Sequence, residues 1–298
     1  MTRPMNRYRK KTTDPSGLLH GLKSAVIFIT AALALMYAYP ASAQGDLMIT
    51  PRRIVFEGNK RTVDINLANT GNDSASYAIS LVQIRMLENG GFETITEPDP
   101  GQMFADRFVR FFPRSVTLGP NEAQVVKVQL YRTSELQTGE YRSHFYFRAV
   151  PKKQALGEPE TPADTSTFSV RLTPIFGITI PVIIRNGETS ASVSLSDLAL
   201  TMGNNNQPRL SFVFNRTGNM SVYGDISVDH ISDKGTVTSV GIANGVAIYT
   251  PNSIRKFQMD LDNQHGVDYS KGTLRVIYSA SSDVKPARLA EAELAIQR

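Results

Sequence analysis

Phe168 to Arg185 read FSVRLTPIFGITIPVIIR, the most regular alternation in the chain. Every even-numbered position from Phe168 to Ile184 is apolar, whereas most odd-numbered positions are polar or glycine. Because side chains alternate between the two faces of a strand, this period of two predicts one long strand with a distinct apolar face. Such a strand is about three times the usual length of ~5–6 residues.

On both sides of this stretch, short runs rich in Val, Ile, Phe, Tyr and Leu alternate with clusters of Gly, Asn, Pro and Asp. That spacing is typical of an all-β sandwich, and no long helical pattern interrupts it. At 298 residues the chain is long enough for two domains that each bury a core. The expected strands before Phe168 are 47–56, 63–69, 77–87, 109–118, 123–132 and 141–150, and those after Arg185 are 190–200, 209–215, 221–232, 236–243, 255–261, 272–279 and 290–296.

The first 43 residues have the three regions of an export signal. Six Lys and Arg residues precede or flank the apolar run 25–35, and Ala41-Ser42-Ala43 has the small residues of a cleavage site. Cleavage there would leave Gln44 as the N-terminus. The alternative is a retained membrane anchor, since 25–43 approaches the ~20 residues of a spanning helix. Pro40 and the cleavage-site residues favour cleavage.

The net positive charge of the chain comes from that signal. It holds six of the 32 basic and one of the 27 acidic residues, so the remainder carries 26 of each and no net charge. The positive charge of the whole chain therefore gives no support to nucleic-acid binding. The absence of cysteine excludes a thiol nucleophile, a disulfide framework and a cysteine-ligated metal.

Nothing in the sequence has the pattern of an enzyme. After the signal the only histidines are His144, His230 and His265, which are far apart and have no metal-ligand spacing. There is no Gly-rich phosphate loop and no nucleophile elbow. We therefore expect no catalytic activity, no cofactor or metal, and no small-molecule substrate.

Two further segments carry a family resemblance together with the long strand. One is Pro51-Arg52-Arg53-Ile54-Val55-Phe56-Glu57-Gly58, and the other is the turn 118–122 followed by 141–151, which ends in a proline. Over residues 46–185 the chain resembles the periplasmic pilus-assembly chaperones, the PapD-like family of chaperone–usher systems, as an atypical member. Beyond residue 185 the likeness is weak.

This resemblance implies an all-β fold of two immunoglobulin-like β-sandwich domains at an angle. We expect a chaperone domain over 44–185 and a C-terminal sandwich over 186–298, with a solvated loop at 151–166. It also implies a location in the periplasm, a pilus or fimbrial subunit as partner, and an outer-membrane usher. A subunit of such a pilus resembles a sandwich that lacks its last strand, and the chaperone adds a strand of its own to the open edge.

The long strand stands where the family has its donor strand. Because the strand must also complete its own sandwich, we expect Ile180, Val182 and Ile184 to pack inside the first domain. The earlier apolar positions are the candidates for filling the groove of a subunit. They are Phe168, Val170, Leu172, Phe176 and Ile178.

The family also holds the terminal carboxylate of the subunit with a buried Arg and a Lys. Arg53 matches that Arg by its place before Ile54, although a surface Arg on an edge strand is an equally good reading of its spacing. The Lys is missing, because Pro181 stands at its place. The candidates to replace it are Arg171, Arg142 and Arg148.

Two interpretations stay open at the level of sequence. A secreted β-sandwich adhesin or pilus-associated structural protein would share the export signal and the strand pattern. It would, however, bury both sides of the strand that a chaperone leaves available at a sheet edge.

Gly139-Glu140-Tyr141 resembles the tyrosine corner of immunoglobulin-like sandwiches, which is a structural feature without a function of its own.

Overall fold

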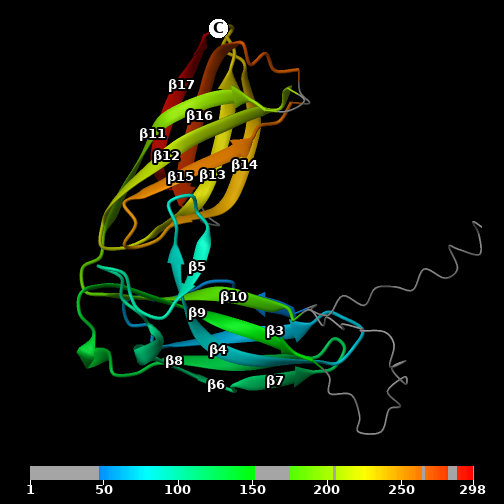
Figure 1. The fold of residues 1–298 in the computed structure, drawn as a ribbon, viewed down its shortest axis with the longest axis vertical. Coiled ribbons are helices and arrows are strands. Elements are labelled where there is room, and N and C mark those ends of the chain that lie inside the picture. The colour runs from blue at the N-terminus through cyan, green and yellow to red at the C-terminus, as the bar shows by residue number, and fades with distance from the viewer. Residues whose placement is uncertain (1–46, 152–174, 204–205, 264–265, 281–286, 298) are drawn as a thin grey trace, which may run out of the picture. The chain divides into compact units, whose positions relative to one another are not determined.

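A computed structural model describes residues 47–151, 175–203, 206–263, 266–280 and 287–297, and residues 44–298 form one compact unit. The predicted signal peptide lies outside the described residues. Figure 1 shows an all-β chain, as the sequence predicts. The strands are β1 (Leu47–Thr50), β2 (Ile54–Phe56), β3 (Thr62–Asn69), β4 (Ala75–Met86), β5 (Phe92–Ile95), β6 (Val109–Phe112), β7 (Ser115–Leu118), β8 (Ala123–Leu130), β9 (Gly139–Val150), β10 (Gly177–Asn186), β11 (Ala191–Met202), β12 (Pro208–Gly218), β13 (Val222–Ile231), β14 (Val237–Ile248), β15 (Ile254–Asp260), β16 (Lys271–Ala280) and β17 (Arg288–Gln297), with short 3-10 helices at Asp106–Phe108 and Thr133–Glu135.

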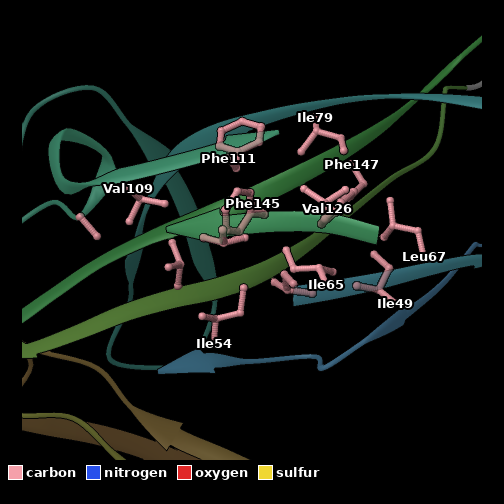
Figure 2. Packing of buried hydrophobic residues seen from close by; sticks show 14 of the residues in the cluster. Ile49, Ile54, Ile65, Leu67, Ile79, Val109, Phe111, Val126, Phe145 and Phe147 are labelled. Carbon is pink, nitrogen blue, oxygen red and sulfur yellow. The ribbon is translucent and has the colours of Figure 1, made fainter. Parts of the chain in front are cut away.

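Strands β1 to β10 form the first sandwich. One sheet has the order β1-β3-β8-β6, and the other has the order β2-β10-β9-β4-β5 with β7 beside β4. Their inner faces share one hydrophobic core, in which Ile65 and Val126 from the first sheet meet Phe145 and Ile79 from the second (Figure 2). Each such fully buried side chain contributes roughly 1.5–3 kcal/mol relative to exposure, so this core is the main source of the sandwich's stability.

Proline divides two of the predicted strands. The expected strand 47–56 is β1 and β2, which belong to different sheets and are separated by a bend at Pro51. The expected strand 109–118 is likewise β6 and β7, with Pro113 between them. Proline has no N–H to give to a sheet ladder, so the chain changes sheets at these points.

Strands β11 to β17 form the second sandwich. Its sheets have the orders β11-β12-β15 and β14-β13-β16-β17. Their core contains the rings of Phe212, Phe214 and Tyr278, and the Phe214 and Tyr278 rings pack edge to face at 5.0 Å. The hydroxyl of Tyr278 is satisfied inside that core, since it donates to the carbonyl of Val246 at 2.7 Å.

The predicted tyrosine corner is confirmed. The hydroxyl of Tyr141, at the start of β9, accepts a hydrogen bond of 2.7 Å from the amide of Gln137. This bond fixes the entry of the chain into β9, the strand that also carries Glu140, Arg142 and His144. Among the described residues, no helix has the length and hydrophobicity needed to cross a membrane.

Candidate partner-binding site

Strand β10 changes from buried to exposed along its length. Val182 and Ile184 are fully buried and Ile180 is 3% exposed, which confirms that these three side chains pack in the first sandwich. The same face continues toward the start of the strand, where Ile178 is 38% and Phe176 is 52% exposed. One apolar stripe therefore runs out of the core and onto the surface.

The edge of β10 is open along this exposed part. On one side β10 pairs with β9 from Gly177 to Asn186, whereas on the other side β2 pairs with residues 182–184. For residues 177–181, no strand among those that the structure describes occupies that second side. Backbone groups and apolar side chains are thus available together, which is the combination that strand addition uses.

The observed strand is shorter than the predicted one. Ile175 and Phe176 lie just before β10, outside any strand, although the carbonyl of Phe176 still accepts a 2.9 Å hydrogen bond from the amide of Ala149. At Gly177 the ring of Tyr146 covers the place where a Cβ would be, so a larger residue there would require this ring to move. The candidates Phe168, Val170, Leu172 and Arg171 lie outside the described residues.

Four arginines line a cavity of about 250 Å³ that is bounded by residues of both sandwiches. We call it the cationic cavity and define it by Arg52, Arg53, Arg142 and Arg255. Its wall includes Pro181, the residue that the sequence comparison predicts in place of a lysine. A concave site with several guanidinium groups is suited to binding an anion, because guanidinium forms paired hydrogen bonds with a carboxylate.

Arg53 is partly buried at the bend before β2. Its guanidinium lies 4.8 Å from the ring centroid of Tyr223, and no carboxylate in the described part of the chain pairs with it. Burial, together with the charges of Arg142 and Arg185, lowers the pKa of Arg53 to about 10. It remains charged at neutral pH, so an anion brought into the cavity would relieve an unfavourable charge.

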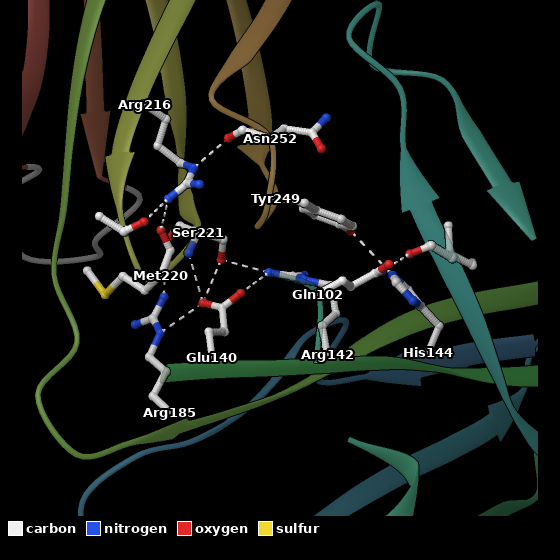
Figure 3. Close-up of polar contacts among 12 residues, drawn as sticks. Gln102, Glu140, Arg142, His144, Arg185, Arg216, Met220, Ser221, Tyr249 and Asn252 are labelled. Carbon is white, nitrogen blue, oxygen red and sulfur yellow. Dashed lines mark hydrogen bonds and ion pairs between the residues drawn. The ribbon is translucent and has the colours of Figure 1, made fainter. Parts of the chain in front are cut away.

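Arg142 differs from Arg53 because it already has a carboxylate partner. Its Nη2 donates to Oε1 of Glu140 and to the hydroxyl of Ser221, both at 2.7 Å, and its guanidinium stacks 3.7 Å from the ring centroid of Tyr249 (Figure 3). Its Nε is buried without a hydrogen-bond partner. Arg142 therefore contributes to the wall of the cavity while its charge is balanced by Glu140.

Glu140 is the centre of a buried network that joins the two sandwiches. Its Oε2 accepts hydrogen bonds from the amide of Ser221 at 3.0 Å, from the Ser221 hydroxyl at 2.8 Å and from Arg185 at 3.3 Å. Burial raises the pKa of this carboxyl, but the charge of Arg142 and the hydrogen bonds of Ser221 outweigh it, and the pKa lies below its usual value. The carboxylate is thus held in its charged form.

Arg216 shapes the segment that presents Ser221 to this network (Figure 3). It is buried, and its guanidinium donates to the carbonyls of Gly218 and Met220 on one segment and of Asn252 and Pro251 on another. The side chain of Asn252 in turn donates to the carbonyl of Met86 at the end of β4, at 2.7 Å. Arg216 therefore fixes two turns of the second sandwich that contact the first.

The structure distinguishes between two of the arginines that were proposed to replace the missing lysine. Arg142 lines the same cavity as Arg53, whereas Arg148 is exposed on β9, opposite Gly177, and does not line it. Arg52 and Arg255 were not predicted as site residues. Arg255 follows Arg53 by about 200 residues and lies in an ordinary alternating strand, so the sequence contains no signal that the two meet in one cavity.

No known protein-family model matches the chain, and no curated protein matches it. Among solved structures, the chain is similar to the Pseudomonas aeruginosa CupB2 chaperone, with 14% identity over 84% of this chain and 100% of that one and a TM-score of 0.39. It is also similar to a chain of the Acinetobacter baumannii CsuC–CsuE complex of a chaperone and a tip adhesion subunit, with 12% identity, 85% and 99% coverage and a TM-score of 0.43.

A third similar structure is the Salmonella enterica SafA pilin in complex with the SafB chaperone. It shares 10% identity over 86% of this chain and 99% of the other, with a TM-score of 0.40. Two of these three structures are complexes of a chaperone with a pilus subunit.

Proposed function

We propose that this protein is a periplasmic chaperone that caps a pilus or fimbrial subunit by lending it the exposed part of β10 and the residues before it. The chaperone would hold the subunit until it reaches an outer-membrane usher. No catalytic step, cofactor, nucleic acid or small-molecule substrate enters this function.

One observation carries the proposal. The apolar stripe of β10 is anchored in the core at Ile180 and is exposed at Ile178 and Phe176, beside an edge that no described strand pairs with from residue 177 to 181. An incomplete sandwich could pair its own edge with this backbone and take these side chains into its groove. Each side chain that becomes fully buried would contribute roughly 1.5–3 kcal/mol, before the ordering costs of association.

The cationic cavity supports the same function. Arg53 has no carboxylate partner in the described part of the chain and lies in a concave site, so the C-terminal carboxylate of a subunit fits it in charge and in the paired hydrogen bonds that a guanidinium can form. A carboxylate held at Arg53 would also set the register in which the subunit pairs with β10. Arg142 would line this site, with Glu140 balancing its charge.

The alternative is a secreted β-sandwich adhesin or a structural protein of the pilus. Such a module gains nothing from an exposed apolar stripe beside an unpaired edge, which is a site of aggregation when it has no partner. The exposure of Ile178 and Phe176 therefore favours the chaperone.

Co-expression with a pilus subunit encoded near this chain's gene tests the proposal. We expect a stable one-to-one complex after purification from the periplasm, and its loss on Ile178→Glu or Leu172→Glu, because a charge cannot enter an apolar groove without a large desolvation cost. Thr179→Glu is the matched control, since it puts the same charge on the opposite face of β10.

The outcomes are distinct. A complex that survives Thr179→Glu but not Ile178→Glu supports donation of the apolar face. If Ile178→Glu and Leu172→Glu both leave the complex intact, the donor-strand assignment is wrong. A chain that forms no complex but assembles into the pilus itself would establish the structural alternative.

A further inference from the structure

Among the described residues, Arg255 is a second arginine of the cationic cavity without a carboxylate partner, and it comes from the second sandwich. It lies on β15, is partly buried, and donates through Nη1 to the carbonyl of Ala247. Its Nε is buried without a hydrogen-bond partner. Burial lowers the pKa of this guanidinium, as expected for a cation that is removed from water without compensation.

The other arginines whose Nε is buried without a hydrogen-bond partner each have a carboxylate partner. Arg85 pairs with Asp99 at 2.9 Å, Arg142 with Glu140 at 2.7 Å, and Arg275 with Asp229 at 2.9 Å. Among the described residues, Arg255 is the member of this group whose charge meets no carboxylate.

Arg53 and Arg255 are held by different parts of the cavity wall. Arg53 packs over Tyr223, whereas Arg255 packs against Gly90, in the turn between β4 and β5. A Cβ at Gly90 would lie 2.7 Å from the Arg255 guanidinium, so the absence of a side chain there makes the approach possible. The cavity thus has two guanidinium groups that no described carboxylate pairs with.

We propose that Arg255 is a second anion subsite, which binds the side-chain carboxylate of an Asp or Glu at the last or next-to-last position of the client. This inference rests on the proposed function, in which Arg53 binds the C-terminal carboxylate. Two separate guanidinium groups call for two negative groups, and a peptide end with an acidic side chain supplies both. A neutral side chain in the same place would leave Arg255 partly buried and uncompensated.

The size of the cavity agrees with such a ligand. Its volume is about 250 Å³, whereas one water molecule needs roughly 10–15 Å³ of the same kind of space. Two carboxyl groups and the short backbone that joins them can therefore enter together. Phe92, which is 58% exposed and packs 5.7 Å from the ring of Tyr249, adds an apolar surface to the wall.

Acetylated tripeptides with a free C-terminus are the probes for this subsite. Glu stands at the last or the next-to-last position with Gly elsewhere, and Gln replaces it in the matched peptides. Binding to the purified protein is followed through the arginine Nε–H signals in nuclear magnetic resonance spectra, at constant ionic strength. We expect a Glu peptide to shift the Arg255 signal and to bind about tenfold more tightly than its Gln partner.

Substitution separates this inference from the proposed function. Arg255→Gln should abolish the preference for Glu while the Gln peptide still binds, and the exposed Arg61→Gln should change neither. If the wild-type protein shows no preference for Glu, or if Arg255→Gln retains it, the second subsite is refuted. If Arg53→Gln leaves the Gln peptide bound as before, the carboxylate site of the proposed function is refuted instead.

Discussion

The carboxylate of Glu140 on β9 accepts hydrogen bonds from both the amide and the hydroxyl of Ser221, which precedes β13 in the other sandwich. Two residues that are 81 positions apart in the chain, one on β9 and one just before β13, are thus joined through one buried side chain. The charge of that side chain is shared between Arg142 and Arg185, so its removal affects three partners at once.

We predict that Glu140→Gln lowers the free energy of unfolding by about 3–5 kcal/mol, because it leaves buried guanidinium groups without their counter-charge. Urea unfolding followed by circular dichroism measures the change. Glu135→Gln is the control, since Glu135 is exposed and pairs with Arg132 at 3.9 Å, an interaction worth about 0–1 kcal/mol. Equal effects of the two substitutions would show that the network does not stabilise the fold.

His144 makes stability depend on pH. Burial, and then the charge of Arg142, lower its pKa to about 3, whereas an unfolded chain protonates histidine near pH 6.5. The unfolded state therefore binds the extra proton between these values. Stability contributed by neutral His144 is complete above about pH 6.5 and falls by roughly 1.4 kcal/mol per pH unit below it.

Unfolding free energies at pH 7 and pH 5 test this dependence. We expect His144→Gln to lose clearly less stability than the wild-type protein between the two values. Glu140 does not interfere, because a carboxyl with a lowered pKa keeps its stabilising contribution at both values and loses it only below its unfolded pKa of 4.5. A wild-type protein equally stable at both values would contradict the prediction.

Gly224 on β13 leaves no room for a side chain. A Cβ there would overlap the carbonyl of Ser279 on β16, and a backbone group in a sheet cannot swing aside. We expect Gly224→Ala to reduce the melting temperature, at a cost of about 1–3 kcal/mol for overpacking. Gly203→Ala, whose nearest neighbour is 3.5 Å away, should be close to neutral, and a similar cost for both would count against the steric explanation.

Arg216 should not tolerate replacement by lysine. Its planar guanidinium reaches four carbonyls, and an ammonium on a flexible stem cannot reproduce that geometry. We expect Arg216→Lys to cost about 2 kcal/mol by urea unfolding. Arg209→Lys, at an exposed pair with Asp260, should be close to neutral. If Arg216→Lys is as mild, the four bonds contribute little to the fold.

The local pattern of the sequence predicts the strands well because alternation depends on neighbours in the chain. The burial of Ile180, Val182 and Ile184 follows from their period of two, and each predicted strand of the second half overlaps an observed one. The short strand β5 was missed, since Phe92 to Ile95 has one apolar residue at each end and no alternation long enough to detect.

The candidate site was only partly predictable. Arg53 could be proposed from the resemblance. Arg142 was one of three candidates to replace the missing lysine, and Arg255 was not among them. The cavity arises where the bend before β2 meets β9, β13, β14 and β15, and these contacts are set by the packing of two sandwiches. The local pattern of the sequence does not indicate which distant residues become neighbours in the fold.

Strand β10 is fixed in the first sandwich at one end and exposed at the other. Folding alone therefore immobilises the backbone of residues 177–181 through its pairing with β9. Fixing one residue costs roughly 1–2 kcal/mol of conformational entropy, and here that loss precedes any encounter with another molecule. A protein that adds a strand to this edge would meet a preorganised template, so more of its contact energy would appear as affinity.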